Sequence, residues 1–396
     1  MKSIVGLDVC KSSVVACLLD FRPVDPRQFY YDCEFHKLYA DVAGIKFLLE
    51  LKPDIAIMEP TGVNYSKLWG THLARAGVEV RLVGHKELRY YRANHLALPD
   101  KDDQADALAL ACYGFDFLET PRRFVQIRDI AIVRIRELVL RLAHLNRVQS
   151  PIINRMRQDL AWQFPEAAHI KSQRNGTGNS PLLYDWLAGI RPSNRYDILY
   201  QESIGLGLSD SVRHHARRLS DLQQEEIQIE RELKELLSNP IFEPYRRVFK
   251  EFGFGQRVES LLLSQIYPLE NYLNADGQPE VKILKGRNSG NPTKRHLSRR
   301  RFEKSLGVAP TQESSGDSKR RKIVGGSDLC RRALWQWVFT RIEPARSRLF
   351  SPIGEHLGKL LDEEKAAGRP IKLVRSRISS KAARLLFQAL VKEIHS

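Results

Sequence analysis

The sequence has few cysteines and no long hydrophobic run. Its five cysteines, at positions 10, 17, 33, 112 and 330, are scattered over 396 residues, and none forms a CxxC pair. This pattern argues against a disulfide framework and a cysteine-based zinc site, and it favours a reducing, cytoplasmic compartment. The longest apolar runs, such as 55–58, are too short to cross a bilayer. From these short runs we expect no membrane partner. Because Asp8 interrupts the first apolar stretch, we also expect no signal peptide.

Acidic residues are outnumbered, and the imbalance is local. The chain holds 63 Lys and Arg against 47 Asp and Glu, a net charge of +16, although residues 1–120 hold 14 against 17. Residues 281–332 hold 15 against 4, so this segment either forms a solvated basic surface or contacts nucleic-acid phosphates. We favour phosphate contact because two basic clusters lie close together. The predicted contacts are Lys294, Arg295, Arg299, Arg300, Arg301, Lys319, Arg320, Arg321 and Lys322.

The first 120 residues alternate β-rich runs with helical spacing, which predicts an α/β domain. The order β-β-β-α-β-α-β-α predicts a ribonuclease-H-like sheet, an antiparallel meander extended by crossover strands. The expected strands are 4–8, 12–19, 29–35, 54–58 and 78–82, and the expected helices are 41–51, 65–75 and 103–113.

Beyond residue 120 the pattern is helical. A leucine-rich seam over 212–237 predicts a coiled coil, with a second protomer or against its own domain. We therefore expect an α/β plus α protein with three parts: 1–120, a helical linker 121–240, and a mostly helical 241–396. The other expected elements are a helix over 127–156 interrupted near Pro151, polar loops at 171–182 and 286–300, and helices over 328–349 and 381–394.

Four acids fall where a metal site could form. Asp8 ends the first strand, Glu59 ends the buried strand 54–58, and Asp103 and Asp106 share one face of a helix. In the predicted sheet these positions converge with no basic residue among them, so we expect a hard cation to sit between them. Oxygen ligands favour Mg²⁺ or Mn²⁺. Alternatively, an Asp at such a position serves as a turn former or helix cap.

Several segments resemble one family. Three N-terminal segments resemble the DEDD signature of the IS one-ten insertion-sequence transposases. The members of this family are bridge-RNA-guided recombinases. The three segments are Gly6-Leu7-Asp8, Glu59-Pro60-Thr61-Gly62 and Asp102-Asp103-Gln104-Ala105-Asp106-Ala107. The family's serine motif resembles residues 306–316, which contain Gly307-Val308-Ala309-Pro310 and Ser315-Gly316. The basic segment 319–322, a glycine turn and the helix start Arg331-Arg332 follow in the family's order.

The resemblance implies a function and a set of roles. It implies a RuvC-like N-terminal domain in which Asp8, Glu59, Asp103 and Asp106 bind the metal, and a C-terminal transposase domain in which Ser315 is the nucleophile. Asp102 and Ser314 are the neighbouring alternatives. The resemblance also implies that the protein forms a dimer or tetramer through 212–237. Its expected partners are a structured non-coding bridge RNA and double-stranded DNA at the element ends and target, with nucleic-acid contacts by Arg331 and Arg332. The expected location is prokaryotic, cytoplasmic and nucleoid-associated.

Three other functions stay open from the sequence. A ribonuclease-H-like resolvase or nuclease would use the four acids and water, and Ser315 would be dispensable. An actin-like sugar kinase is suggested by residues 6–13, although Cys10 stands where that fold needs glycine. A non-catalytic nucleic-acid-binding protein is the third, and the intact acids argue against it.

Overall fold

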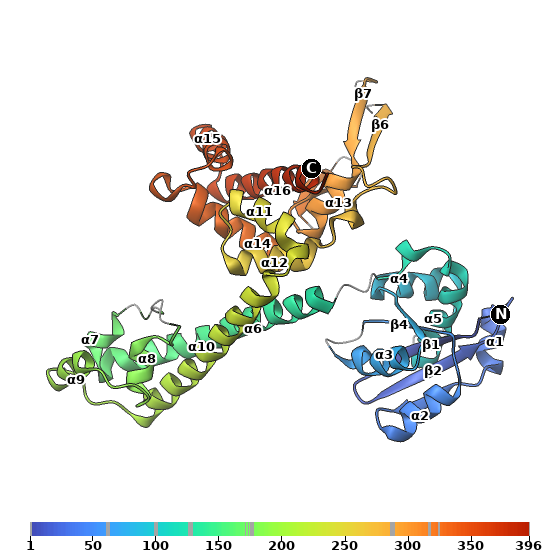
Figure 1. The fold of residues 1–396 in the computed structure, drawn as a ribbon, viewed down its shortest axis with the longest axis horizontal. Coiled ribbons are helices and arrows are strands. Elements are labelled where there is room, and N and C mark those ends of the chain that lie inside the picture. The colour runs from blue at the N-terminus through green and yellow to red at the C-terminus, as the bar shows by residue number, and fades with distance from the viewer. Residues whose placement is uncertain are drawn as a thin grey trace. The chain divides into compact units, whose positions relative to one another are not determined.

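The computed structural model describes most of the chain. It covers residues 2–60, 64–98, 102–125, 130–170, 172, 174, 178–285, 290–315, 318–323 and 325–395, with the backbone alone described at 122, 130, 311–315 and 318–322. The chain divides into an N-terminal unit, Met1–Arg128, and a C-terminal unit, Asp129–Ser396 (Figure 1). No helix in the described ranges is long and apolar enough to cross a membrane.

A five-stranded sheet organises the N-terminal unit. The strands lie in the order β3-β2-β1-β4-β5; β2 is antiparallel to both β1 and β3, and β4 is parallel to both β1 and β5. The predicted antiparallel meander with parallel crossover strands is confirmed. The strands are β1 (Ile4–Val9), β2 (Ser13–Leu19), β3 (His36–Tyr39), β4 (Ile55–Met58) and β5 (Glu79–Leu82).

The strand expected over 29–35 is wrong. Its aromatic residues lie mostly in a helix, α1 (Pro26–Asp32), and the third strand begins later, at His36. Asp25 caps this helix by accepting hydrogen bonds from the backbone N–H groups of Arg27 and Gln28, and Pro26 occupies the first helical position. The aromatic side chains prefer strands, but here the cap stabilises a helix. In this helix Phe29 and Tyr30 pack against the apolar core.

Helix α5 (Asp103–Phe117) packs on β1 at very short range. A Cβ atom at Gly6 would lie 2.0 Å from the carbonyl oxygen of Ala107, so glycine is required where strand and helix meet. All residues from Ala107 to Gly114 are buried. This contact fixes the first turn of α5 relative to the carboxyl end of β1.

The remaining helices of the N-terminal unit include one that the sequence patterns did not predict. Helix α4 (His85–Tyr90) follows β5 and continues into a π-helical turn, Tyr91–His95. The expected helices over 41–51 and 65–75 are confirmed. They are α2 (Val42–Glu50) and α3 (Tyr65–Arg75).

Two long helices form an antiparallel pair at the start of the C-terminal unit. They are α6 (Ile130–Gln163) and α10 (Asp210–Leu237), and they lie side by side in Figure 1. The seam predicted over 212–237 thus packs against α6 of the same chain: Arg134 pairs with Glu232, and Arg141 with Glu225. The interruption expected near Pro151 is wrong. The helix continues through Pro151 because Met156 and Leu160, beyond it, are buried in an apolar cluster with α10.

Short helices cover the far end of this pair. Phe164 and Leu219 lie in one buried apolar cluster together with Leu183, Leu187 and Tyr196. The helices are α7 (Pro165–Ala168), α8 (Leu182–Leu187) and α9 (Asn194–Gln201).

The remainder of the C-terminal unit is helical with two hairpins. The loop expected over 286–300 is wrong for 292–300, because 292–296 is a strand and 297–300 begin a helix that packs through Phe302. Residues 290–291 are irregular as expected, and 286–289 lie outside the described residues. The helix expected over 328–349 is present but shorter, and the helix expected over 381–394 is present but longer. The elements are α11 (Glu243–Glu251), α12 (Gln256–Ile266), β6 (Val281–Lys285), β7 (Pro292–His296), α13 (Leu297–Ser305), β8 (Pro310–Ser315), β9 (Ser318–Ile323), α14 (Asp328–Trp337), α15 (Pro352–Ala366) and α16 (Ile371–His395).

Candidate active site

Asp8 and Glu59 lie at one edge of the sheet. Leu7 of β1 is in register with Met58 of the parallel strand β4, so the residues that follow them, Asp8 and Glu59, lie side by side. Asp103 and Asp106 occupy the first turn of α5, which packs against β1. Side chains from two strands and one helix thus meet at the carboxyl end of the two parallel strands.

The other three acids act electrostatically on Asp8. Burial, followed by the negative charges of Asp106, Asp103 and Glu59, raises the pKa of Asp8 from 3.8 to about 7. A carboxyl group placed among like charges resists ionisation. A divalent cation would remove this penalty, and four carboxylates offer the hard oxygen ligands that Mg²⁺ and Mn²⁺ prefer. The residues therefore fit such an ion.

Cys10 also lies in this cluster, which the sequence did not indicate. Ligand atoms of Asp8, Cys10 and Asp103 lie within 4.8 Å of one another, and the Cys10 thiol donates to Asp103 Oδ2 at 3.8 Å. Burial and then the charges of Asp103 and Asp8 raise the pKa of the Cys10 thiol, which keeps it protonated. A thiol is a poor ligand for a hard cation, so Cys10 acts here as a hydrogen-bond donor.

Asp102 and Asp103 have different surroundings. Asp102 is the N-cap of α5: its Oδ1 accepts from the backbone N–H of Ala105 at 2.6 Å, and its Oδ2 accepts from the Tyr30 hydroxyl at 2.6 Å. Asp103, one residue later, faces Asp8 and Cys10. The geometry therefore assigns the capping position to Asp102 and leaves Asp103 with the cluster.

Two basic side chains belong to the cluster, contrary to the expectation that none would. Arg92, only 7% exposed, donates from Nη1 to Asp106 Oδ1 at 2.6 Å, and His85 Nδ1 lies 2.7 Å from Glu59 Oε2. His85 follows β5 at the same edge of the sheet and could have been found from that position. Arg92 lies in the π-helical turn, for which the sequence gives no signal; such turns are frequent at functional sites.

Ser314 and Ser315 lie in a hairpin of the C-terminal unit. They are the last two residues of β8, and Ser315 is paired with Ser318 of β9. The side chains of Ser314, Ser315 and 319–322 fall outside the description, so the proposed nucleophile is placed by its backbone alone.

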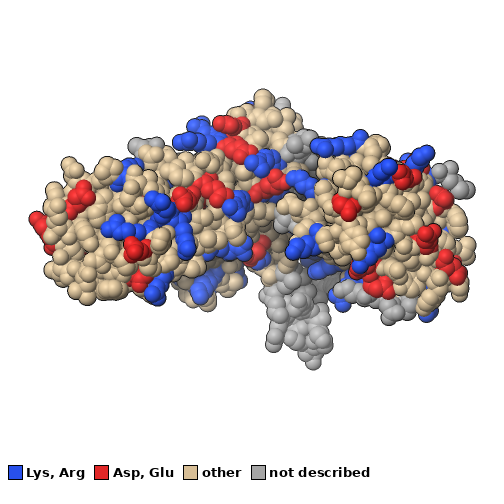
Figure 2. All heavy atoms as spheres, turned by 90° about the horizontal axis from the view of Figure 1, so that it is seen from below, with Lys and Arg blue, Asp and Glu red and all other residues tan. Residues whose placement is uncertain are grey.

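The other predicted nucleic-acid contacts fall into two groups. Lys294, Arg295 and Arg300 are exposed. The others pair within the chain: Arg299 with Glu303 at 3.5 Å, Arg301 with Glu280 at 2.8 Å, and both Arg331 and Arg332 with Asp328. On the face drawn in Figure 2, basic and acidic side chains are interspersed rather than segregated.

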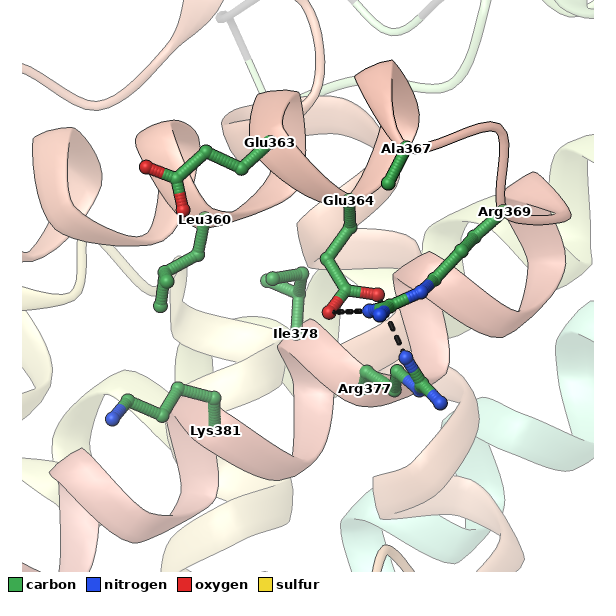
Figure 3. A pocket seen from close by; sticks show the side chains of 8 residues that line it. All are labelled: Leu360, Glu363, Glu364, Ala367, Arg369, Arg377, Ile378 and Lys381. Atoms are coloured by element: carbon green, nitrogen blue, oxygen red, sulfur yellow. Dashed lines mark hydrogen bonds and ion pairs between the residues drawn. The ribbon is translucent and has the colours of Figure 1, made fainter.

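A separate pocket lies between α15 and α16 (Figure 3). Glu364 there pairs with both Arg369 and Arg377, and Leu360 and Ile378 contribute apolar surface. None of the four acids lines this pocket, and its best-placed charges already pair with each other, so we do not assign the chemistry to it.

The comparisons with known proteins give one family and one group of structures. Residues 289–351 match the model of the Transposase IS116/IS110/IS902 family. Two structures of Thermus thermophilus RuvC, one in complex with a Holliday junction substrate, are similar at 12% identity and a TM-score of 0.23; they cover 32% and 31% of this chain and 100% and 99% of their own. No curated protein matches the chain.

Proposed function

We propose that this protein is the DNA transposase of an insertion sequence, a recombinase that cleaves and rejoins DNA. The observation that carries the proposal is the convergence of Glu59, Asp103 and Asp106 on Asp8, which favours a divalent-metal site. The match of residues 289–351 to a transposase family supports the reaction class. The net charge of +16 suits a polyanionic substrate.

The four acids would hold Mg²⁺ or Mn²⁺. When bound, such an ion stabilises the charge that develops on the attacking and leaving oxygens of a phosphodiester. Arg92 holds Asp106 in place by a buried ion pair, and the exposed His85 contacts Glu59 through Nδ1 at 2.7 Å. Helix α5 positions Asp103 and Asp106 together, because Asp102 caps its first turn.

Ser315 would supply the nucleophile. Its Oγ attacks phosphorus and loses its proton, the bond from phosphorus to the 3′-oxygen breaks, and that oxygen leaves as a 3′-hydroxyl after taking up a proton. The resulting phosphoserine conserves the energy of the phosphodiester. A 3′-hydroxyl from another strand then attacks phosphorus, releases the serine and restores a phosphodiester without ATP. Basic residues 319–322 and Arg331 would neutralise the phosphate.

The RNA and the assembly belong to the same proposal. Resemblance of residues 1–113 and 305–337 to bridge-RNA-guided recombinases favours a structured RNA guide and a dimer or tetramer. Since the 212–237 seam packs on α6 within the chain, an oligomer would use other surfaces of this helix pair.

The second candidate is a metal-dependent nuclease or junction resolvase that uses water. The acid cluster favours it equally, since the cluster alone is sufficient for hydrolysis. The two candidates differ in one product, the covalent bond between protein and DNA.

A denaturing gel distinguishes them. Purified protein is incubated with Mg²⁺, RNA from the non-coding stretch beside the gene, and labelled DNA spanning the joined element ends. Wild-type protein is expected to form a covalent DNA adduct. Ser315→Ala should abolish it, whereas Ser314→Ala, the neighbouring control, should retain it. Asp8→Asn should lower adduct formation by at least about a hundredfold.

Cleavage without an adduct, unchanged in Ser315→Ala but lost in Asp8→Asn, would reject the recombinase and favour the nuclease. An adduct lost in Ser314→Ala and kept in Ser315→Ala would move the nucleophile by one residue and leave the reaction class intact.

A further inference from the structure

The hairpin of β6 and β7 extends away from the helices of the C-terminal unit as an arm (Figure 1). We define the arm as residues 281–285 and 290–296. Of the ten residues in its two strands, all but Thr293 are exposed. Val281 pairs with His296 and Lys285 with Pro292, so the strands are in register over their full length, about 17 Å.

The base of the arm is firmly held. The backbone N–H of Glu280 donates to Ser298 Oγ at 2.8 Å, and its carbonyl accepts from the N–H of Leu297 at 2.9 Å. The Glu280 carboxylate pairs with Arg301 at 2.8 Å. These bonds fix the arm to α13, so its direction is set by the fold.

The arm carries positive charge on both faces and no acid. Its basic side chains are Lys282, Lys285, Lys294 and Arg295. Because side chains alternate along a strand, Lys282 and its cross-strand partner Arg295 lie on one face, and Lys285 and Lys294 lie on the other. A single flat basic patch would place these charges on one side only.

Aliphatic side chains stand among these charges. Val281, Ile283 and Leu284 are 43%, 66% and 51% exposed. An isolated two-stranded hairpin is marginally stable in water, and aliphatic surface on both faces adds to that cost. A partner that surrounds the arm would cover this surface.

We propose that the arm inserts into the major groove of duplex DNA. Its basic side chains contact the phosphates that flank the groove on either side, and Ile283 and Leu284 contact base edges and thymine methyl groups. This inference rests on the proposed function for the choice of DNA as the polymer. It identifies the arm as an element that contacts the duplex, and the major groove as the place where it binds.

Groove dimensions favour this partner over others. The major groove of B-DNA, about 12 Å wide, admits a two-stranded ribbon, whereas the minor groove is about half as wide. In duplex RNA the major groove is deep and narrow, and side chains cannot enter it. Charge on both faces of the ribbon matches two walls of phosphate.

Binding is measured by fluorescence anisotropy with full-length protein, in EDTA, over a salt series. EDTA separates binding from cleavage, so the result is independent of the acid cluster. The probes are a 30-base-pair DNA duplex and the corresponding RNA duplex. The double variant Lys282→Ala/Lys294→Ala should reduce the slope of log affinity against log salt for DNA by about 1.8. The matched control, Lys359→Ala/Lys372→Ala, removes two exposed lysines from α15 and α16 and should leave the slope unchanged.

A second variant tests the aliphatic contacts. Ile283→Thr/Leu284→Thr keeps strand-forming residues and should weaken DNA binding about tenfold with an unchanged salt slope. Guanine N7, which faces the major groove, should be protected from dimethyl sulfate by wild-type protein and exposed in this variant. Wild-type affinity and slope in both arm variants, equal losses in the control pair, or a loss confined to the RNA duplex would each overturn the proposal.

Discussion

Asp8 in the N-terminal unit and Glu226 in the C-terminal unit are two carboxyl groups whose neighbours carry opposite charges. Asp8 is surrounded by other acids, and its pKa is raised to about 7. Glu226, 2% exposed, accepts from Gln149 at 2.7 Å, from Arg257 at 2.7 Å and from Arg174 at 3.2 Å. Side chains that only stabilise a fold satisfy one another, whereas the acid cluster retains a repulsion that a bound cation would relieve.

The two units also differ in net charge. Residues 1–128 contain 17 Lys and Arg and 17 Asp and Glu, so the whole excess of 16 positive charges lies in residues 129–396. The unit with the acid cluster is neutral, and the unit with the arm and the transposase match is basic. Under the proposed function, metal binding and phosphate binding would thus be separated along the chain.

The largest effect is expected from breaking the satisfied carboxylate. Glu226→Ala removes one of the two carboxylates, Glu226 and Glu230, that Arg174 and Arg257 share. It also leaves the buried Gln149 amide without its acceptor, so it should destabilise the C-terminal unit by about 3 kcal/mol. Differential scanning calorimetry of the full chain should show the C-terminal transition lowered and the N-terminal one unmoved.

The neighbouring residue provides the control. Glu225 pairs with Arg141 at 3.0 Å, but both side chains are substantially exposed. Glu225→Ala should therefore cost less than about 1 kcal/mol. Equal losses in the two variants would mean that burial of the Glu226 network contributes nothing.

The next effect concerns the packing that assembles the acid cluster. Gly6→Ala places a Cβ against the backbone of α5, 2.0 Å from the Ala107 carbonyl oxygen and 2.5 Å from the Ala111 nitrogen. Backbone atoms cannot yield as a flexible side chain can, so we expect a loss of about 3 kcal/mol in the N-terminal unit. Calorimetry of the full chain measures it.

Gly70→Ala is the matched control in the same unit. Gly70 lies within α3, and its added Cβ would meet only side-chain atoms, the nearest at 3.6 Å. Alanine favours the helix by up to about 1 kcal/mol over glycine, so this variant should be neutral or more stable. Destabilisation by Gly70→Ala as large as that by Gly6→Ala would contradict the packing argument.

The sequence predicted the sheet well because its strands have clear patterns. Residues 55–58 form a continuous apolar run buried on both faces, and Gly6, at the helix contact, lies within the similarly apolar β1. The prediction of a strand over 29–35 is wrong because Asp25, the N-cap, starts a helix just before the aromatic residues. The prediction of a loop over 286–300 is wrong for 292–296 because a polar composition does not exclude an exposed two-stranded ribbon.

Part of the candidate site was also predictable. The positions of Asp8, Glu59, Asp103 and Asp106 follow from strand ends and one helical turn, so topology brings them together. Arg92 could not be predicted, because it reaches Asp106 only through the π-helical turn. His85 could have been proposed from its position shortly after β5, at the edge of the sheet where the acids lie. Cys10 directly follows β1, but its sequence position alone does not indicate the contact with Asp103.

The smallest effect concerns the repulsion within the acid cluster. The pKa of Asp8 rises from 3.8 in the unfolded chain to about 7 in the folded one. A raised folded-state pKa gives a stability contribution that is complete below pH 3.8 and is lost as pH rises through 7. Asp8→Asn removes this loss. In EDTA the variant should therefore melt a few degrees above wild type at pH 8, and this advantage should largely disappear at pH 4.

Magnesium should reverse that difference, because a cation among the acids stabilises the folded wild type and finds one ligand fewer in Asp8→Asn. Asp20→Asn, a change at an exposed acid of the same unit, should follow wild type at both pH values and with Mg²⁺. If Asp8→Asn melts below wild type in EDTA at pH 8, the carboxylates do not repel one another. The contrast with Glu226 would then fail, since both acids would be satisfied by their own surroundings.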